Sequence, residues 1–295
     1  MTRLTSSDID AVAEELQEYD CYLRSATGRS LLEIGAAAAG IDPAAKVERL
    51  APTVKVAVVP VRSGMGIITG FTRTVCGILT HLGFDARVTE HTDVAGFAEA
   101  MEGKARVIMA ADDDRFVAFC PGQSTIVDNA PATADGFVAG LDLMAGGLAS
   151  KAVLVLGCGP VGRWAVRALV ARGAMVSVVD PIPGKAAELA DWAEKNLQTL
   201  IRVMPDGEQA LNSHDLIVDA TNAADIIHTR HVSASTRVAA PGMPRGLTDR
   251  ALENLQGRVL HDPLQIGVAV MACEAVVTLE ASDPAADPDR KPGEA

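Results

Sequence analysis

The 295-residue sequence is poor in aromatic side chains, which make up only 3% of it, although 48% of its residues are hydrophobic. Its core must therefore consist mainly of Ala, Val, Leu, Ile and Met, which is typical of Ala-rich helices packed on Val-rich parallel strands. No apolar run approaches the roughly 20 residues that a membrane span needs, and the first residues, MTRLTSSDID, lack a signal-like apolar stretch. We therefore expect a cytoplasmic α/β protein with no membrane partner.

Basic residues are also few, with 26 Lys and Arg against 38 Asp and Glu, which gives a net charge of -12. Because nucleic-acid binding needs a basic face to neutralise phosphates, we expect no nucleic-acid partner. The five cysteines form no CxxC pair, and the six histidines are scattered. This pattern predicts reduced thiols and no metal site.

The length and the element pattern predict two domains with a cleft between them. We expect a helical and α/β substrate domain over 1–148, a parallel-sheet Rossmann domain over 149–282 and a disordered tail over 283–295. Hydrophobic periodicity and turn residues predict strands at 54–61, 87–89, 106–111, 115–120 (an edge strand), 152–156, 175–180, 201–204, 216–219, 237–240 and 259–261. The same signals predict helices at 5–26, 30–39, 94–101, 132–148, 161–173, 186–200, 248–255 and 264–279, a helix ending near 82, and a connector at 43–52.

The strongest motif is the turn Gly157-Cys158-Gly159-Pro160-Val161-Gly162, which follows a buried strand and opens a helix. In this context the first glycine permits a tight turn, the second lets the backbone approach a pyrophosphate, and the third allows close packing of strand and helix. The phosphates would face the helix N-terminus. We predict a dinucleotide site here, and the alternative is a tight turn without a ligand.

Asp180 ends the next strand, about 20 residues further on, where a carboxylate can accept hydrogen bonds from the adenosine ribose hydroxyls. A 2'-phosphate would meet like charge at this position. Pro181 rather than arginine follows the aspartate, so the sequence favours NAD over NADP, although Lys185 is nearby.

Two later strand ends carry small or turn-forming residues, and dinucleotides cross that edge of such a sheet. We expect the nicotinamide and its ribose to be flanked by Ala220, Thr221, Asn222, Pro241 and Gly242. Ile266 would line the ring from below. Each of these segments alone is equally compatible with an ordinary turn.

The other half of the chain has Ser63 in a Gly-rich turn and Asp112, Asp113 and Asp114 at a strand end. Carboxylates beside a nicotinamide suit an amine, because a carboxylate can bind the ammonium and accept its proton during oxidation. Neighbouring side chains alternate in direction, so at most two of the three aspartates can point inward. The alternative is a solvated acidic loop, and Asp128-Asn129 is equally compatible with a simple turn.

Several longer blocks of the sequence are more specific than the glycine turn, namely VPVRSGMGII at 59–68, HLGFDARVTE at 81–90, VIMAADDDRF at 107–116, PGMP at 241–244 and DPLQIGVAVM at 262–271. In these blocks the sequence resembles the PylD family of pyrrolysine-biosynthesis dehydrogenases. The resemblance implies NAD-dependent oxidation of the terminal amine of (3R)-3-methyl-D-ornithyl-N6-L-lysine, with loss of ammonia and ring closure to L-pyrrolysine. It also implies a functional role for Asp113, positions near the substrate for Ser63, Asn129 and Leu4, and an amino-terminal helix that closes over the substrate.

We consider three alternative functions. A dehydrogenase of the glutamate or leucine type would need a lysine in a GGxK setting, and a methylenetetrahydrofolate type would need Tyr-xxx-Lys; the sequence has neither. A sensor that binds NAD to regulate a partner would need a DNA-binding element or an apolar patch. We expect a small-molecule substrate and a homodimer, which is a common state for such enzymes.

Overall fold

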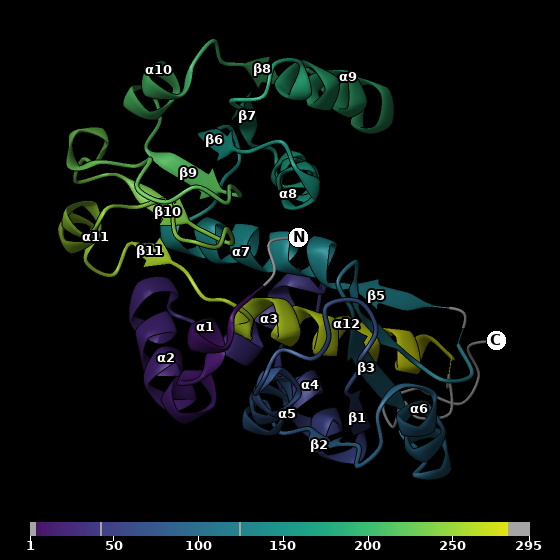
Figure 1. The fold of residues 1–295 in the computed structure, drawn as a ribbon. Helices are drawn as coiled ribbons and strands as arrows, with labels where there is room; N and C mark the ends of the chain where they lie inside the picture. The colour runs from purple at the N-terminus through teal and green to yellow at the C-terminus, as the bar shows by residue number, and fades with distance from the viewer. Residues whose placement is uncertain (1–3, 42, 124, 283–295) are drawn as a thin grey trace, which may run out of the picture.

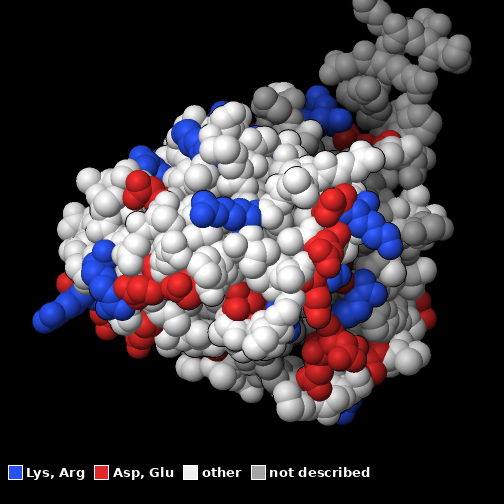
Figure 2. Space-filling view, turned by 90° about the horizontal axis from the view of Figure 1, so that it is seen from above, with Lys and Arg blue, Asp and Glu red and all other residues white. Residues whose placement is uncertain are grey.

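The computed structural model describes residues 4–41, 43–123 and 125–282. Figure 1 shows two units, each built on one sheet, with helix α7 between them. None of the helices in these ranges is long and apolar enough to cross a membrane. Figure 2 shows one face, on which acidic side chains form a band along one side with lysine and arginine beside it.

The first sheet has the strand order β2-β1-β3-β4-β5. β2, β1 and β3 are parallel, whereas β4 is antiparallel to both of its neighbours. The strands are β1 (Lys55–Val59), β2 (Asp85–Val88), β3 (Val107–Ala111), β4 (Phe116–Phe119) and β5 (Ile126–Asp128). The helices of this unit are α1 (Ser6–Ile9), α2 (Val12–Thr27), α3 (Leu31–Ala38), α4 (Ala45–Leu50), α5 (Phe71–His81) and α6 (Asp93–Glu102), with a 3-10 turn η1 (Ala51–Thr53).

The second sheet has the order β11-β10-β9-β6-β7-β8, and all its strands are parallel. This is the Rossmann order, whose direction reverses between β6 and β9 and opens a crevice there. The strands are β6 (Ala152–Leu156), β7 (Met175–Val179), β8 (Arg202–Val203), β9 (Leu216–Asp219), β10 (Arg237–Ala239) and β11 (Val259–Leu260). The helices are α8 (Pro160–Ala171), α9 (Lys185–Leu197), α10 (Gly207–Asn212) and α11 (Asp249–Leu255), with a 3-10 turn η2 (Thr229–His231). The α/β class and the Rossmann sheet expected from the sequence are confirmed.

Two long helices, α7 (Asn129–Ala145) and α12 (Gln265–Ser282), pack against each other, and α7 connects the two units. α7 contacts α8, β9 and β10 of the second unit as well as α3 and α12. A Cβ on Gly136 of α7 would lie 2.4 Å from the Ile266 side chain, so the missing side chain allows the two helices to approach closely. α12, which we expected in the Rossmann domain, packs against α3 and α5 of the first unit and against α7.

Other differences from the sequence expectations involve short elements. The helix expected at 5–26 divides into α1 and α2, and the connector expected at 43–52 contains α4. The expected edge strand at 115–120 is β4, an inner strand, because β5 pairs beyond it. β5 has only three residues, too few for a recognisable alternation. The tail expected at 283–295 lies outside the described residues.

Candidate active site

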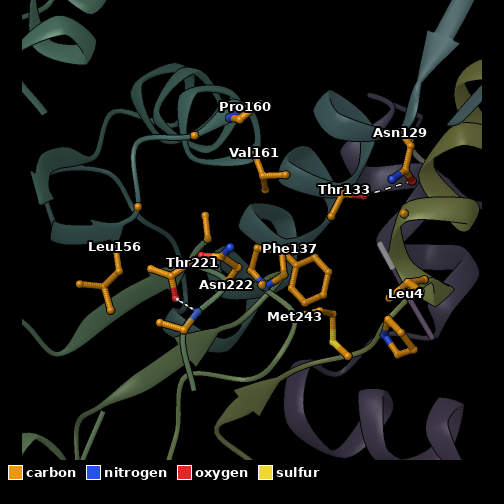
Figure 3. A pocket seen from close by; sticks show the side chains of 18 of the residues that line it. Leu4, Asn129, Thr133, Phe137, Leu156, Pro160, Val161, Thr221, Asn222 and Met243 are labelled. Atoms are coloured by element: carbon orange, nitrogen blue, oxygen red, sulfur yellow. Dashed lines mark hydrogen bonds between the residues drawn. The ribbon is translucent and has the colours of Figure 1, made fainter. Parts of the chain in front are cut away.

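A cavity of about 1100 Å³ opens at the carboxyl ends of strands from both sheets. It is lined by the last residues of β1, β3, β6 and β7, by the segments that follow β9, β10 and β11, and by the start of α7. Side chains from α7, α8, the loop after β9 and the amino-terminal segment face one another around it (Figure 3). Parallel sheets place ligands at this edge, so the cavity is the candidate active site.

Most of the residues singled out in the sequence line this cavity. They are Leu4, Asp112, Asp113, Asn129, Gly157, Gly159, Pro160, Val161, Asp180, Ala220, Thr221, Asn222, Pro241 and Gly242. Ser63, Cys158, Gly162 and Ile266 are not among the lining residues. Ile266 is fully buried in the contact between α12 and α7, and Ser63 is exposed in the loop after β1.

The glycine turn between β6 and α8 has a separate requirement at each glycine. Gly157 has a φ of 87°, a conformation that favours glycine. At Gly162 a Cβ would lie 2.0 Å from the Gly157 carbonyl oxygen, so only glycine lets α8 start this close to the strand. At Gly159, the N-cap of α8, a Cβ would meet nothing within 4 Å, and this open space belongs to the cavity. The turn therefore leaves room for a ligand at a helix N-terminus.

Asp180 lies beside this turn, and two backbone N–H groups orient its carboxylate. Its Oδ2 accepts the Cys158 N–H at 2.7 Å and its Oδ1 accepts the Ile182 N–H at 2.9 Å. Burial, with the charge of Asp180, raises the pKa of the Cys158 thiol to about 12. Cys158 is therefore a protonated thiol near neutral pH. Its backbone N–H, rather than its thiol, connects the turn to Asp180.

A buried aspartate that sequence reasoning did not single out holds the nicotinamide-side loops together. Asp219, at the end of β9, is fully buried and accepts hydrogen bonds from the Thr221 hydroxyl at 2.7 Å and the Gly246 N–H at 3.0 Å. Burial raises the pKa of this carboxyl. Gly242 fits only without a side chain, because a Cβ there would lie 2.0 Å from the Thr221 carbonyl oxygen. The two loops that we expected to flank the nicotinamide are thus packed as one unit.

The three adjacent aspartates after β3 have different environments. Asp112 accepts the N–H groups of Arg115 at 2.8 Å and Asp114 at 2.9 Å, and these bonds lower the pKa of its carboxyl. Asp113 accepts the Met65 N–H at 2.6 Å, so it joins the β3 turn to the Gly-rich loop after β1. Asp114 is exposed and also lines the cavity. Asp112 therefore stabilises its own turn, whereas Asp113 connects that turn to the loop after β1.

The start of α7 forms a second polar wall. Asp128 caps the helix by accepting the Ala130 N–H at 3.0 Å, so α7 begins at Asn129 rather than near 132 as expected. The Asn129 Oδ1 accepts the Thr133 hydroxyl at 3.2 Å, and both side chains face the cavity (Figure 3). A Cβ on Gly267 of α12 would lie 2.8 Å from that oxygen. Gly267, which the sequence places beside Ile266 under the nicotinamide ring, lines the cavity, and Thr133 is a lining residue that the sequence did not indicate.

A buried carboxyl also lines the cavity, at Asp262 after the last strand. It is only 4% exposed, and its Oδ2 accepts the hydroxyl of Tyr19 on α2 at 2.7 Å. Its Oδ1 accepts the Ile266 N–H at the start of α12 at 3.2 Å. Burial raises the pKa of this carboxyl to about 6 against these hydrogen bonds. An aspartate at the end of a strand could have indicated this residue, but nothing local indicates its partner 243 positions away.

Metal-ligating side chains do not gather among the described residues of this cavity. Within the part of the chain that the structure describes, no group of three His, Cys, Asp or Glu could hold a metal ion. His261 is not a lining residue; its Nδ1 lies 2.8 Å from the Ala240 carbonyl oxygen, and burial lowers the pKa of its ring. The site thus combines a dinucleotide-type turn with carboxylates.

Comparisons with known proteins cover both halves of the chain. The family described as "Pyrrolysine biosynthesis protein PylD, N-terminal domain" matches residues 8–127, and "Shikimate / quinate 5-dehydrogenase" matches residues 142–250. Among solved structures, quinate dehydrogenase from Corynebacterium glutamicum in complex with NAD has a TM-score of 0.53 at 14% identity, over 75% of this chain and 93% of that one. This likeness shows the fold.

Two relatives match nearly end to end. The pyrrolysine synthase of Methanosarcina acetivorans is 30% identical over 275 residues, which cover 92% of this chain and 98% of that protein. The pyrrolysine synthase of Methanosarcina barkeri is 29% identical over 273 residues, which cover 92% and 97%. The chain therefore belongs to the PylD family of pyrrolysine synthases and is an oxidoreductase.

Proposed function

We propose that the protein oxidises the terminal amine of (3R)-3-methyl-D-ornithyl-N6-L-lysine with NAD, releases ammonia and closes the ring of L-pyrrolysine. The observation that carries this proposal is that the glycine turn after β6 and the aspartates after β3 line the same cavity. A hydride acceptor and an ammonium could therefore be held together. The names of the two full-length relatives support this substrate.

The residues of the second unit fit a nicotinamide dinucleotide. α8 is a 12-residue helix whose N-terminus, at Gly159 and Pro160, lines the cavity and would attract a pyrophosphate. Asp180 lines the same space and would accept hydrogen bonds from the adenosine ribose. Because a 2'-phosphate would meet this carboxylate, we propose NAD rather than NADP. When bound, NAD would supply the two-electron acceptor.

The proposed reaction consists of an oxidation followed by a ring closure. Loss of a hydride and a proton from the terminal CH–NH unit leaves a protonated imine. The α-amino group of the same ornithyl residue then adds to the imine carbon, and the bond from that carbon to the original terminal nitrogen breaks, which releases ammonia and leaves the ring C=N. Electrons and atoms balance with one NAD reduced for each ammonia released.

We assign the proton transfer to Asp113. Its carboxylate is oriented by the Met65 N–H, and its neighbour Asp112 is occupied by two N–H groups of its own turn. The Asp113 carboxylate would hold the ammonium and receive its proton as the hydride leaves. Asn129 and Leu4 would contact the substrate from the α7 wall and the amino-terminal segment.

The test is to incubate the purified protein with NAD and the isopeptide, and to follow NADH absorbance, ammonia and product mass. We expect equal amounts of NADH and ammonia and a product that lacks two hydrogens and one ammonia relative to the substrate. Free ornithine and free lysine serve as control amines, and NADP as the control cofactor. Turnover of the free amino acids but not the isopeptide would favour another amine dehydrogenase. NAD binding without any turnover would favour an NAD sensor.

A further inference from the structure

The wall of the cavity on the first unit is acidic, with one exception. Its charged lining residues there are Asp112, Asp113 and Asp114, followed by Arg115. The other Arg and Lys side chains among the described lining residues are Lys185 and Arg230, and both belong to the second unit. Arg115 is thus the cation that this wall offers to a substrate.

The guanidinium of Arg115 is held by one edge. Its Nε and Nη2 donate to the same oxygen of Asp128, the Oδ2, at 2.8 Å and 2.7 Å. Within the described ranges, Nη1 has no hydrogen-bond partner. A guanidinium offers two forks of donors, and binding through the Nε and Nη2 edge leaves the Nη1 and Nη2 edge available for a second carboxylate.

The anchoring aspartate is itself fixed, so the guanidinium is pre-oriented. The Oδ1 of Asp128 accepts the Ala130 N–H at 3.0 Å in the first turn of α7. The side chain of Arg115 lines the cavity and is 57% exposed, against 27% for Asp128, so the guanidinium is accessible from solvent. A carboxylate that binds there would meet a cation already held in position, and would lose little of its affinity to ordering the side chain.

We infer that Arg115 is a specificity-determining residue that binds the α-carboxylate of the lysyl end of the substrate through its Nη1 and Nη2 edge. This inference rests on the proposed function, because the isopeptide carries one carboxylate and several amino groups. An acidic wall suits the amino groups but repels the carboxylate, which Arg115, the one Lys or Arg among the described lining residues of the first unit, can bind. The lysyl carboxylate lies at the opposite end of the molecule from the reacting amine, which matches an exposed position.

The test compares two substrates that share the reacting amine, the isopeptide and its α-carboxamide analogue. A charge-assisted carboxylate pair contributes about 10-fold or more, so we expect the wild type to prefer the carboxylate by about that factor in kcat/KM. Arg115→Gln should reduce the preference to near 1 while its activity on the carboxamide stays close to that of the wild type. Arg115→Lys, which keeps a charge but lacks the fork, should retain only part of the preference.

Arg29→Gln is the matched control. Arg29 is 54% exposed and is also paired with one carboxylate, that of Glu33 at 3.2 Å, but it does not line the cavity. Its preference should equal that of the wild type. Melting temperature and NADH binding show whether each variant is folded. If Arg115→Gln is not folded, the substrate preference of Arg115→Lys is compared with that of the wild type instead.

Two results would overturn the inference: a wild type without the preference, or an Arg115→Gln protein that keeps it. In both cases NADH is still formed, so the proposed function stands. A wild type that binds NAD but forms no NADH from either substrate instead refutes the proposed function, and this inference with it.

Discussion

Tyr19→Phe should destabilise the protein in a way that depends on pH, because the hydroxyl it removes donates to the buried carboxyl of Asp262 at 2.7 Å. The pKa of Asp262 is raised from 3.8 to about 6 by burial, so the carboxyl is ionised at pH 8 and protonated at pH 4.5. The hydroxyl stabilises the ionised form. Loss of the hydroxyl should therefore lower the free energy of unfolding most at pH values above the pKa of Asp262.

The size of the effect follows from the charge of the acceptor. A shift of about 2 pKa units means that burying the ionised carboxyl costs about 3 kcal/mol at pH 8. A hydrogen bond to a charged group contributes about 1.5 to 3 kcal/mol, whereas one to a neutral group contributes about 1 kcal/mol. Tyr19→Phe should thus lower the free energy of unfolding by about 2 kcal/mol at pH 8 and about 1 kcal/mol at pH 4.5.

The stability of the wild type also depends on pH through Asp262, and the contribution of this group falls as the pH rises. Because the folded-state pKa of Asp262 is raised, the folded protein holds a proton that the unfolded chain has released between pH 3.8 and about 6. The contribution of this group is fully present below pH 3.8 and is lost as the pH rises through about 6. Each variant must therefore be compared with the wild type at the same pH.

Tyr22→Phe is the control, since the Tyr22 hydroxyl donates to an uncharged group, the Val259 carbonyl. Its cost should be about 1 kcal/mol at both pH values. Urea unfolding followed by circular dichroism at pH 4.5 and pH 8 measures all of these differences. A Tyr19→Phe cost that is independent of pH and equal to that of Tyr22→Phe would refute the assignment of an ionised Asp262 at pH 8.

Three further variants test the cavity. Gly162→Ala would place a Cβ 2.0 Å from the Gly157 carbonyl oxygen, so the turn must shift and NADH affinity, measured by fluorescence titration, should fall about 10-fold to 100-fold; unchanged affinity would contradict the phosphate-binding role of the turn. Asp180→Ala should weaken NAD binding about 10-fold and reduce the discrimination against NADP in the same titration, and unchanged values would remove Asp180 from the ribose site. Asp113→Asn should lower kcat by about 100-fold or more in the NADH assay with NADH affinity unchanged, and full activity would transfer the base role to Asp112 or to water.

The dinucleotide turn could be predicted because its requirements are local. Gly157, Gly159 and Gly162 lie within one strand, turn and helix unit, and their spacing alone reflects a positive φ, an open cradle and a close contact. Asp180 follows from the same unit, since the next strand must end beside the turn. The α/β class follows from the alternation of apolar strands and helices.

Contacts between distant segments could not be predicted from one sequence. Asp262 in an Asp-Pro pair is compatible with an ordinary turn, and only the fold brings Tyr19 to it from α2. Arg115 and Asp128 are partners because β4 and β5 are adjacent, and β5 was too short to be recognised. The packing of α12 was equally hidden, since a helix that is apolar on all sides is buried against whichever surface the fold provides.

The position of α12 also bears on the order in which the chain can fold. Because this helix completes the core of the first unit, the whole nucleotide-binding half is, in effect, an insertion between α7 and its packing partner. During synthesis, residues 1–148 leave the ribosome before residues 265–282 have been made. Until α12 is available, the apolar surfaces of α3 and α7 that it covers stay exposed. The two halves are therefore expected to behave as one cooperative protein, and neither continuous half should be stable when expressed alone.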